Sequence, residues 1–179
     1  MIAVFLADGF EEIEALAVVD ILRRADLEVR TIGVGTPTPT GAHGIQVQAD
    51  MADTALDITA LCCLVLPGGM PGTLNLEASH VVRDALAYAV GKGLPVAAIC
   101  AAPSILGHGG YLRGVQATCY PGFEKELTDA VLSDKAVVTD GLFTTAAGAG
   151  VAVDFALELV SRLVSPATAK SIREAIQCR

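Results

Sequence analysis

Four runs of almost uninterrupted apolar residues constrain the fold of this chain more than any other feature. Each run is short and bounded by turn-forming residues. Such strands are typical of a parallel sheet covered on both faces, because a sheet with one solvated face shows alternating apolar and polar residues. The four runs are residues 2–7, 62–66, 96–99 and 142–145.

Shorter strand candidates and helical segments alternate with these runs along the whole chain. This alternation predicts an α/β fold with a doubly wound, mostly parallel sheet and helices on both faces. Repeats, low-complexity tracts and linkers are absent from the sequence, so we expect a single domain over residues 1–179. The shorter strands are expected at 29–33, 45–49, 116–120 and 136–139, and the helices at 12–24, 81–92, 103–106, 151–163 and 167–177.

Composition excludes several classes of protein. Hydrophobic residues make up 53% of the 179 residues and charged residues 18%, a balance that excludes disorder and coiled coil. The formal net charge is −8. A negative surface repels phosphate backbones and anionic lipids, so we expect neither nucleic acid nor membrane as a partner. The low charge content favours a second subunit covering apolar surface.

The sequence also bears on cellular location. The longest stretch free of acidic and basic residues, 93–112, contains Pro95, Pro103, Gly107, Gly109 and Gly110, which would break a membrane-spanning helix. The N-terminus lacks the basic region of a signal peptide, so a cytoplasmic protein is expected. Five cysteines without a CxxC pair fit free thiols in a reducing compartment, and neither a disulfide framework nor a zinc site.

Ligands of parallel sheets bind at the carboxyl ends of the strands, so the segments that follow the four apolar runs should converge. Cys100 directly follows one run, at a strand-to-helix turn. A helix N-terminus there would stabilise a thiolate and lower the pKa of Cys100. The alternative is a buried cysteine that acts as a small hydrophobic side chain.

Acidic and glycine residues lie in the same group of segments. Glu11 and Glu12 fit the ordinary role of acidic residues in a first helical turn, facing water. Glu14 is the candidate for an inward-facing carboxyl that would be protonated and act on the thiol as acid or base. Gly68 and Gly69 form either an oxyanion hole or a plain turn.

Three motifs in this order resemble the ThiJ/PfpI superfamily, and within it the deglycase branch, over nearly the full chain. They are 9–14 (GFEEIE), 66–69 (LPGG) and 98–103 (AICAAP). The resemblance implies a flavodoxin-like sandwich, a homodimer, a nucleophilic and oxidisable Cys100, a partner Glu14, and backbone of Gly68 and Gly69 that binds the reacting oxygen. It implies glyoxalase or deglycase chemistry on 2-oxoaldehydes or their adducts, without a cofactor or metal.

Four positions that the resemblance places around the substrate depart from the family pattern. Ala101 stands where the peptidase branch carries histidine, so peptidase activity is not expected. Tyr120 replaces a histidine, His43 replaces an arginine, and the run around Gly148 lacks the arginine and proline of its relatives. A site without these groups should bind anionic substrates less well.

Two other functions remain open from the sequence. In one, Cys100 is oxidised to sulfinate, stabilised by protonated Glu14, and the protein is a stress sensor or chaperone-like protein without turnover. In the other, the site is vestigial and the chain is an interaction domain. The physiological substrate, a small carbonyl compound under the enzymatic hypothesis, is not fixed by the sequence.

Overall fold

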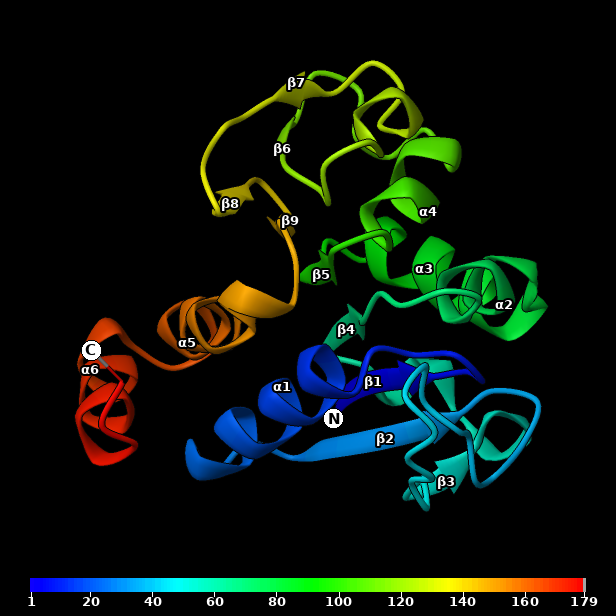
Figure 1. Ribbon diagram of the computed structural model, residues 1–179, viewed down its shortest axis with the longest axis horizontal. Coiled ribbons are helices and arrows are strands. Elements are labelled where there is room, and N and C mark those ends of the chain that lie inside the picture. Colours follow the sequence, from blue (N-terminus) through cyan, green and yellow to red (C-terminus); the bar gives the residue numbers. More distant parts are fainter. Residues whose placement is uncertain (179) are drawn as a thin grey trace.

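The computed structural model describes residues 1–178. Within them, a seven-stranded sheet has the order β3-β2-β1-β4-β5-β9-β8, with helices on both faces (Figure 1). All neighbours pair in parallel except β8 and β9. The strands are β1 (Ile2–Leu6), β2 (Val29–Gly33), β3 (Met51–Ala52), β4 (Cys63–Leu66), β5 (Val96–Ile99), β8 (Val137–Asp140) and β9 (Phe143–Ala146), with β6 (Gln116–Ala117) and β7 (Val131–Leu132) forming a separate pair.

The helices confirm most of the helical segments expected from the sequence, within a few residues at their ends. They are α1 (Glu12–Arg24), α2 (Gly72–Ala78), α3 (His80–Gly91), α4 (Pro103–His108), α5 (Ala152–Leu163) and α6 (Pro166–Ala175). Four short 3₁₀ turns are η1 (Asp53–Ala55), η2 (Ile58–Ala60), η3 (Glu124–Glu126) and η4 (Ala149–Val151). The described part of the chain therefore has the flavodoxin-like architecture that the resemblance implied.

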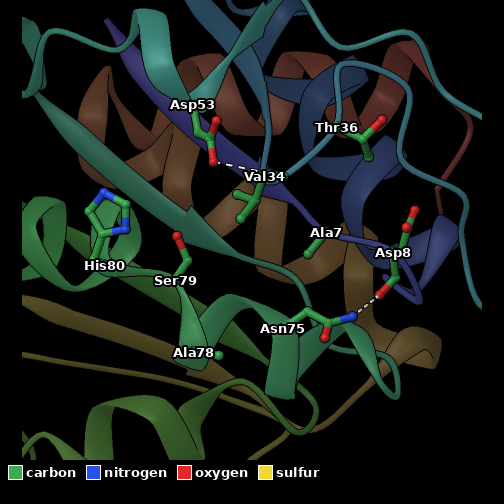
Figure 2. A pocket seen from close by; sticks show the side chains of 10 residues that line it. Ala7, Asp8, Val34, Thr36, Asp53, Asn75, Ala78, Ser79 and His80 are labelled. Carbon is green, nitrogen blue, oxygen red and sulfur yellow. Dashed lines mark hydrogen bonds between the residues drawn. The ribbon is translucent and has the colours of Figure 1, made fainter.

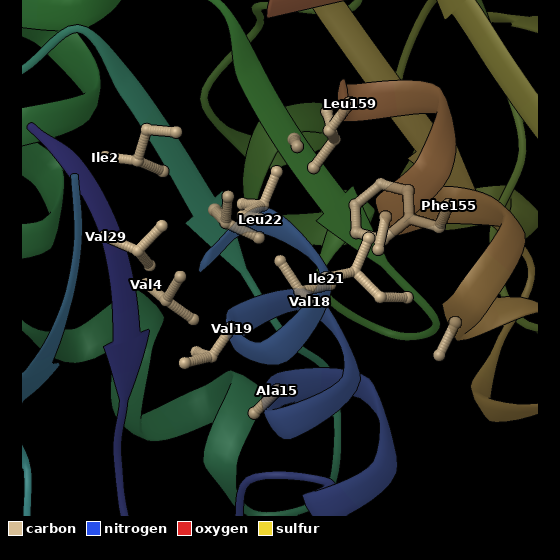
Figure 3. Packing of buried hydrophobic residues seen from close by; sticks show 14 of the residues in the cluster. Ile2, Val4, Ala15, Val18, Val19, Ile21, Leu22, Val29, Phe155 and Leu159 are labelled. Atoms are coloured by element: carbon tan, nitrogen blue, oxygen red, sulfur yellow. The ribbon is translucent and has the colours of Figure 1, made fainter. Parts of the chain in front are cut away.

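The four apolar runs form the centre of the sheet. Every residue of β1, β4, β5 and β9 is buried, because helices cover both faces. One face packs on α1, α5 and α6, where Val18 and Leu22 meet Phe155 (Figure 3). The opposite face packs on α2, α3 and α4. Burial on two faces explains why these strands show no alternation.

One expected strand, at 45–49, is wrong. This segment forms only an isolated bridge between Thr40 and Gln46, and its Val47 and Ala49 N–H groups donate to the carbonyls of Pro39 and Pro37. Its backbone is therefore satisfied by the preceding loop instead of the sheet.

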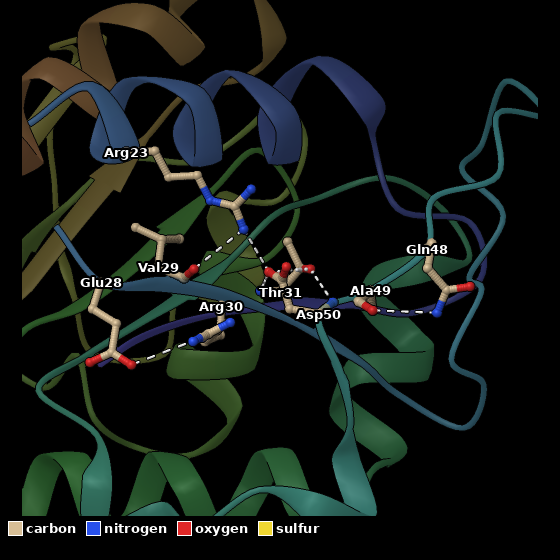
Figure 4. Close-up of polar contacts among 8 residues, drawn as sticks. All are labelled: Arg23, Glu28, Val29, Arg30, Thr31, Gln48, Ala49 and Asp50. Carbon is tan, nitrogen blue, oxygen red and sulfur yellow. Dashed lines mark hydrogen bonds and ion pairs between the residues drawn. The ribbon is translucent and has the colours of Figure 1, made fainter. Parts of the chain in front are cut away.

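The side chain of the neighbouring Asp50 prevents pairing with β2 before residue 51. Its carboxylate accepts hydrogen bonds from the backbone N–H and hydroxyl of Thr31 and forms an ion pair with Arg23 (Figure 4). A side chain thus takes the donor that a ladder partner would use, and pairing with β2 begins only at Met51.

Two other differences concern short elements. The expected strand 116–120 pairs only at Gln116 and Ala117, in the small sheet with β7. Helix α2 was not expected, because Gly72, Thr73 and Asn75 are weak helix formers. It begins where Gly72 N–H and the Thr73 hydroxyl donate to the carbonyls of Gly9 and Gly69. None of the described helices is both long and apolar enough to cross a membrane.

Candidate active site

The segments that follow β1, β4, β5 and β9 converge at one edge of the sheet, as predicted. Glu11 N–H donates to the carbonyl of Gly68 at 2.9 Å, which joins the end of β1 to the end of β4. Cys100 N–H donates to Ala146 O at 2.8 Å, which joins the end of β5 to the end of β9. Parallel pairing of neighbouring strands therefore brings the thiol, the glutamates and the glycine turn together.

Cys100 occupies a constrained turn between β5 and α4. Its φ of +65° lies in the left-handed region, which side chains rarely adopt. Two backbone hydrogen bonds hold it there, because its N–H donates to Ala146 and its carbonyl accepts from Tyr120 N–H, each at 2.8 Å. The side chain is partly exposed. A strained, accessible thiol at a strand-to-helix turn is the setting of an exposed nucleophile.

Glu14 points inward from α1 and is 1% exposed. Its Oε2 accepts the Gly68 N–H at 2.8 Å. Its Oε1 has no hydrogen-bond partner of ordinary geometry within residues 1–178, and the facing Cys100 thiol shifts the pKa of the carboxyl. A glycine is required at position 68, because a Cβ there would lie 2.7 Å from both Cys100 Cβ and Glu14 Oε2.

The pKa of Glu14 is raised, as expected, but the pKa of Cys100 is not lowered. Burial raises the pKa of Glu14 to about 7, while the facing Cys100 thiol and the Gly68 N–H oppose the rise and the charge of Glu11 adds to it. The predicted lowering of the Cys100 pKa is wrong. Burial, followed by the charge of Glu14, raises the pKa of Cys100 to about 12. Burial and the neighbouring carboxylate both disfavour the thiolate.

Some backbone N–H groups of the site donate to the Glu14 carboxyl and others point at the Cys100 sulfur. The N–H groups of Ala101 and Gly69 point at the Cys100 sulfur and oppose the rise of its pKa. The Gly68 N–H, expected to bind the reacting oxygen, instead donates to Glu14. Sequence reasoning did not assign the Ala101 N–H, although its signal is positional, since the residue after an elbow nucleophile commonly supplies such a donor.

The predicted substrate-facing residues do not all gather at the thiol. Gly148 lies next to it, because a Cβ on Gly148 would be 4.0 Å from Cys100 Sγ and 3.2 Å from the Tyr120 ring. Tyr120 is half-exposed and flanks the same opening. His43 lies further out, with its Nδ1 2.9 Å from Glu12 Oε2 and 3.6 Å from Glu11 Oε2.

Glu12 is not the solvent-facing residue that the sequence predicted, since it is 5% exposed. Its carboxylate accepts from the backbone N–H groups of His43 and Ile45 and contacts the His43 ring. Burial raises the pKa of Glu12, but these hydrogen bonds outweigh burial and hold it below its usual value. Glu11, Glu12 and His43 place three potential metal-ligand atoms within 4.8 Å of one another. Both Glu12 oxygens already have protein partners.

A separate cavity of about 440 Å³ lies at the carboxyl ends of β1 and β2 (Figure 2). Polar residues including Asp8, Asp53, Asn75 and His80 line it, while Cys100 and Glu14 do not. Size alone therefore does not identify the reactive site, which is defined by the constrained thiol and its buried carboxyl.

A flavodoxin-like sandwich with a thiol at a strained turn and a buried carboxyl facing it defines a class of cysteine-centred α/β proteins. Residues 1–162 match the model of the DJ-1/PfpI family. The chain belongs to this family.

Relatives and solved structures agree with that assignment. The chain is 34% identical over 143 residues to a deglycase of Pyrococcus abyssi, covering 78% of this chain and 85% of the relative. It is 31% identical over 166 residues to a glutathione-independent glyoxalase of Caenorhabditis elegans, covering 90% and 87%. The structure of oxidized Toxoplasma gondii DJ-1 superimposes with a TM-score of 0.95 at 31% identity, covering 98% of this chain and 97% of that one.

Proposed function

We propose that this protein is a cysteine-dependent glyoxalase or deglycase that acts on 2-oxoaldehydes or their adducts without a cofactor. The observation that carries the proposal is the pairing of the Cys100 thiol with the buried Glu14 carboxyl, whose pKa of about 7 suits proton transfer near neutral pH. Relatives named glyoxalase and deglycase support the reaction class.

The first step joins sulfur to the aldehyde carbon. Glu14, as carboxylate, takes the proton from the Cys100 thiol while the sulfur attacks the aldehyde carbon. The carbonyl π electrons move to oxygen, and the N–H groups of Gly69 and Ala101 are the donors available to stabilise that charge. Glu14 then returns the proton to the oxygen, which gives a hemithioacetal. A neutral thiol suffices, because deprotonation accompanies attack.

The second step moves hydrogen from carbon to carbon. Glu14, again ionised, removes the proton from the former aldehyde carbon, the electron pair forms the carbon–carbon double bond of an enediol, and Glu14 passes the proton to the oxygen of the neighbouring ketone carbon. Glu14 then takes the proton from the hydroxyl on the sulfur-bearing carbon and delivers it to the neighbouring carbon, which leaves a thioester of the 2-hydroxy acid. Water then cleaves the thioester, releases the acid and restores the Cys100 thiol. The net reaction adds one water to the 2-oxoaldehyde.

The charges beside the thiol favour uncharged substrates. Glu11 lies beside this site and contributes negative charge. Tyr120 and Gly148 flank the thiol and offer no positive charge. His43 and Ala101 are assigned lesser roles, as an outer polar group and a backbone donor. Ala101 has no imidazole for a cysteine–histidine dyad, so the proposal does not include peptidase activity.

Replacement of the Cys100 thiol by a hydroxyl tests the proposal. Cys100→Ser should lower conversion of methylglyoxal to lactate by at least about a hundredfold, because a hydroxyl is a far weaker nucleophile at neutral pH. Cys62→Ser is the matched control, since Cys62 is exposed and precedes β4. Conversion would be followed by chiral chromatography of lactate. Full turnover in the Cys100→Ser variant would overturn the proposal.

A sensor function is the second candidate, because the N–H groups of Gly69 and Ala101 surround the sulfur where sulfinate oxygens would need donors. The solved relative in its oxidized form makes the same candidate relevant. Mass spectrometry of Cys100 after mild peroxide, beside the methylglyoxal assay, separates the two functions. Stable sulfinate with negligible turnover would favour the sensor.

We also propose that the protein acts as a homodimer in a reducing, cytoplasmic environment. Large apolar side chains stand exposed on and beside α1, where Ile13 is 57% and Ile45 54% exposed. The five cysteines all carry free thiols. Sedimentation velocity at micromolar concentration checks the subunit number.

A further inference from the structure

Three short segments leave the candidate site, and their far ends meet at one histidine. Helix α2 follows the Gly68–Gly69 turn, α4 follows Cys100, and the segment with η3 follows Tyr120. His108, the last residue of α4, places Nδ1 2.6 Å from Glu77 Oε1 of α2 and Nε2 2.8 Å from Glu126 Oε2 of η3. One imidazole therefore links these three segments.

The η3 segment depends on this link more than the other two. It belongs to neither sheet, and His108–Glu126 is the only ion pair within residues 1–178 that ties η3 to another element. The backbone of η3 packs closely against Gly107, because a Cβ at position 107 would lie 2.1 Å from Glu126 O. Leu127 is buried beneath it.

Two backbone hydrogen bonds connect η3 to Tyr120. Glu126 N–H donates to Phe123 O, and Phe123 N–H donates to Tyr120 O, each at 3.0 Å. Tyr120 N–H in turn donates to Cys100 O. Movement of Glu126 would therefore reach, within two turns of chain, the ring that flanks the thiol.

We propose that His108 is a positioning residue of the Cys100 site, and that its bridge from Glu77 to Glu126 holds the Tyr120 segment over the thiol. Its effect on turnover rests on the proposed function, whereas its effect on the Tyr120 segment does not. The nearby Gly107 and Leu127 contacts remain when the bridge is lost, so we expect local loosening and not unfolding.

Bridging two carboxylates requires both ring nitrogens to donate, which only the imidazolium can do. Hydrogen bonds from Glu126 and Glu77 raise the pKa of His108 above its ordinary value. Arg83 and Tyr111 line the same 200 Å³ cavity as His108 and Glu77, and Lys125 lies next to Glu126 in η3. Because the folded pKa is raised, the bridge is complete at low pH and is lost as pH rises through that value.

Hydrogen exchange of the Phe123 and Glu126 amides tests the proposal directly. At pH 6, His108→Gln should exchange about threefold to fivefold faster than wild type, the range of a half-exposed ion pair. At a pH well above the His108 pKa, the two should converge. His108→Lys keeps a permanent cation and should retain protection across the whole range. His80→Gln is the matched control, because His80 is exposed and lies outside the bridge.

Two further readouts separate positioning from general stability. Cys100 alkylation by iodoacetamide should be faster in His108→Gln at pH 6, because Tyr120 covers the thiol less. In a turnover assay, KM for methylglyoxal should rise more than kcat falls. Unchanged amide exchange in both His108→Gln and Glu126→Gln would overturn the inference, even if Cys100 proved essential. Faster exchange without any turnover would support the bridge and remove only the proposed reaction.

Discussion

Glu12 and Glu14 lie within the first turn of one helix, and both are buried, yet their environments shift their pKa values in opposite directions. Glu12 accepts from two backbone N–H groups and contacts the His43 ring, and its pKa is held below the usual value. Glu14 accepts from one N–H, at Gly68, and its pKa is raised to about 7. Burial raises the pKa of both carboxyls, but the hydrogen bonds to Glu12 outweigh burial whereas those to Glu14 do not.

Each carboxyl has a glycine that gives it room. A Cβ at Gly41 would lie 2.2 Å from Glu12 Oε1, and one at Gly68 would lie 2.7 Å from Glu14 Oε2. Around Glu12 this close approach lets backbone donors surround the oxygens. Around Glu14 it lets the thiol of Cys100 approach instead. The same close packing of a glycine thus accompanies a carboxyl of lowered pKa in one place and a carboxyl of raised pKa in the other.

The largest expected effect separates the two glutamates by activity. Glu14→Gln keeps the shape and the Gly68 hydrogen bond but cannot accept a proton, so kcat/KM for methylglyoxal should fall about 10²- to 10⁴-fold. Glu12→Gln should leave kcat/KM within about threefold, because Glu12 bonds a loop and does not face the thiol. Steady-state lactate formation measures both variants.

Equal losses in the two variants would contradict this division of roles. Circular dichroism of each variant serves as the control for folding. A loss confined to Glu12→Gln would move the reactive centre toward His43.

The sequence predicted the central sheet well because burial on both faces leaves a strong pattern. Strands β1, β4 and β5 lie within the apolar runs at 2–7, 62–66 and 96–99. Helix α1 begins and ends at the expected residues. The segment 45–49 could not be predicted, since its partner is a loop at Pro37 and Pro39. Such pairing depends on tertiary placement that no local pattern encodes.

In the candidate site, too, local patterns predicted some features, while features that depend on tertiary contacts could not be predicted. The positions of Cys100 and Glu14 followed from strand ends and helix spacing. The raised pKa of Glu14 also agrees with the expectation, but the pKa of Cys100 does not, because burial and the charge of Glu14 act on the thiol. Glu12 was misassigned for a related reason, since its donors come from residues 43 and 45, far along the chain.

A second prediction contrasts the two carboxyls by stability. The folded pKa of Glu14 is about 7, against an ordinary value of 4.5, so the folded state binds its proton more tightly. That contribution is present below pH 4.5 and is lost as pH rises to about 7, a change of about 3 kcal/mol in the free energy of unfolding. The lowered pKa of Glu12 gives the opposite sign, with stability present above pH 4.5 and lost on acidification.

Urea unfolding of wild type, Glu14→Gln and Glu12→Gln at several pH values from about 2.5 to about 8.5 measures these contributions as differences. Relative to wild type, Glu14→Gln should gain stability as pH rises, and Glu12→Gln should gain it as pH falls. Parallel profiles for the two variants would show that the carboxyls share one environment after all.

The smallest expected effect tests the charge that Glu11 adds to the site. The wild-type rate should fall as pH drops below about 7, because Glu14 must be ionised to accept the thiol proton. Glu11→Gln removes a negative charge that raises the Glu14 pKa, so this acid limb should move to lower pH. The shift should be modest, since burial is the larger cause, and it should shrink in high salt.

Glu28→Gln supplies the matched control, because Glu28 is exposed, pairs loosely with Arg30 and changes the net charge by the same amount. If both variants moved the acid limb equally, the effect would come from net charge and not from the position of Glu11. A shift in Glu11→Gln alone would show that the charge at the N-cap of α1 raises the pKa of Glu14.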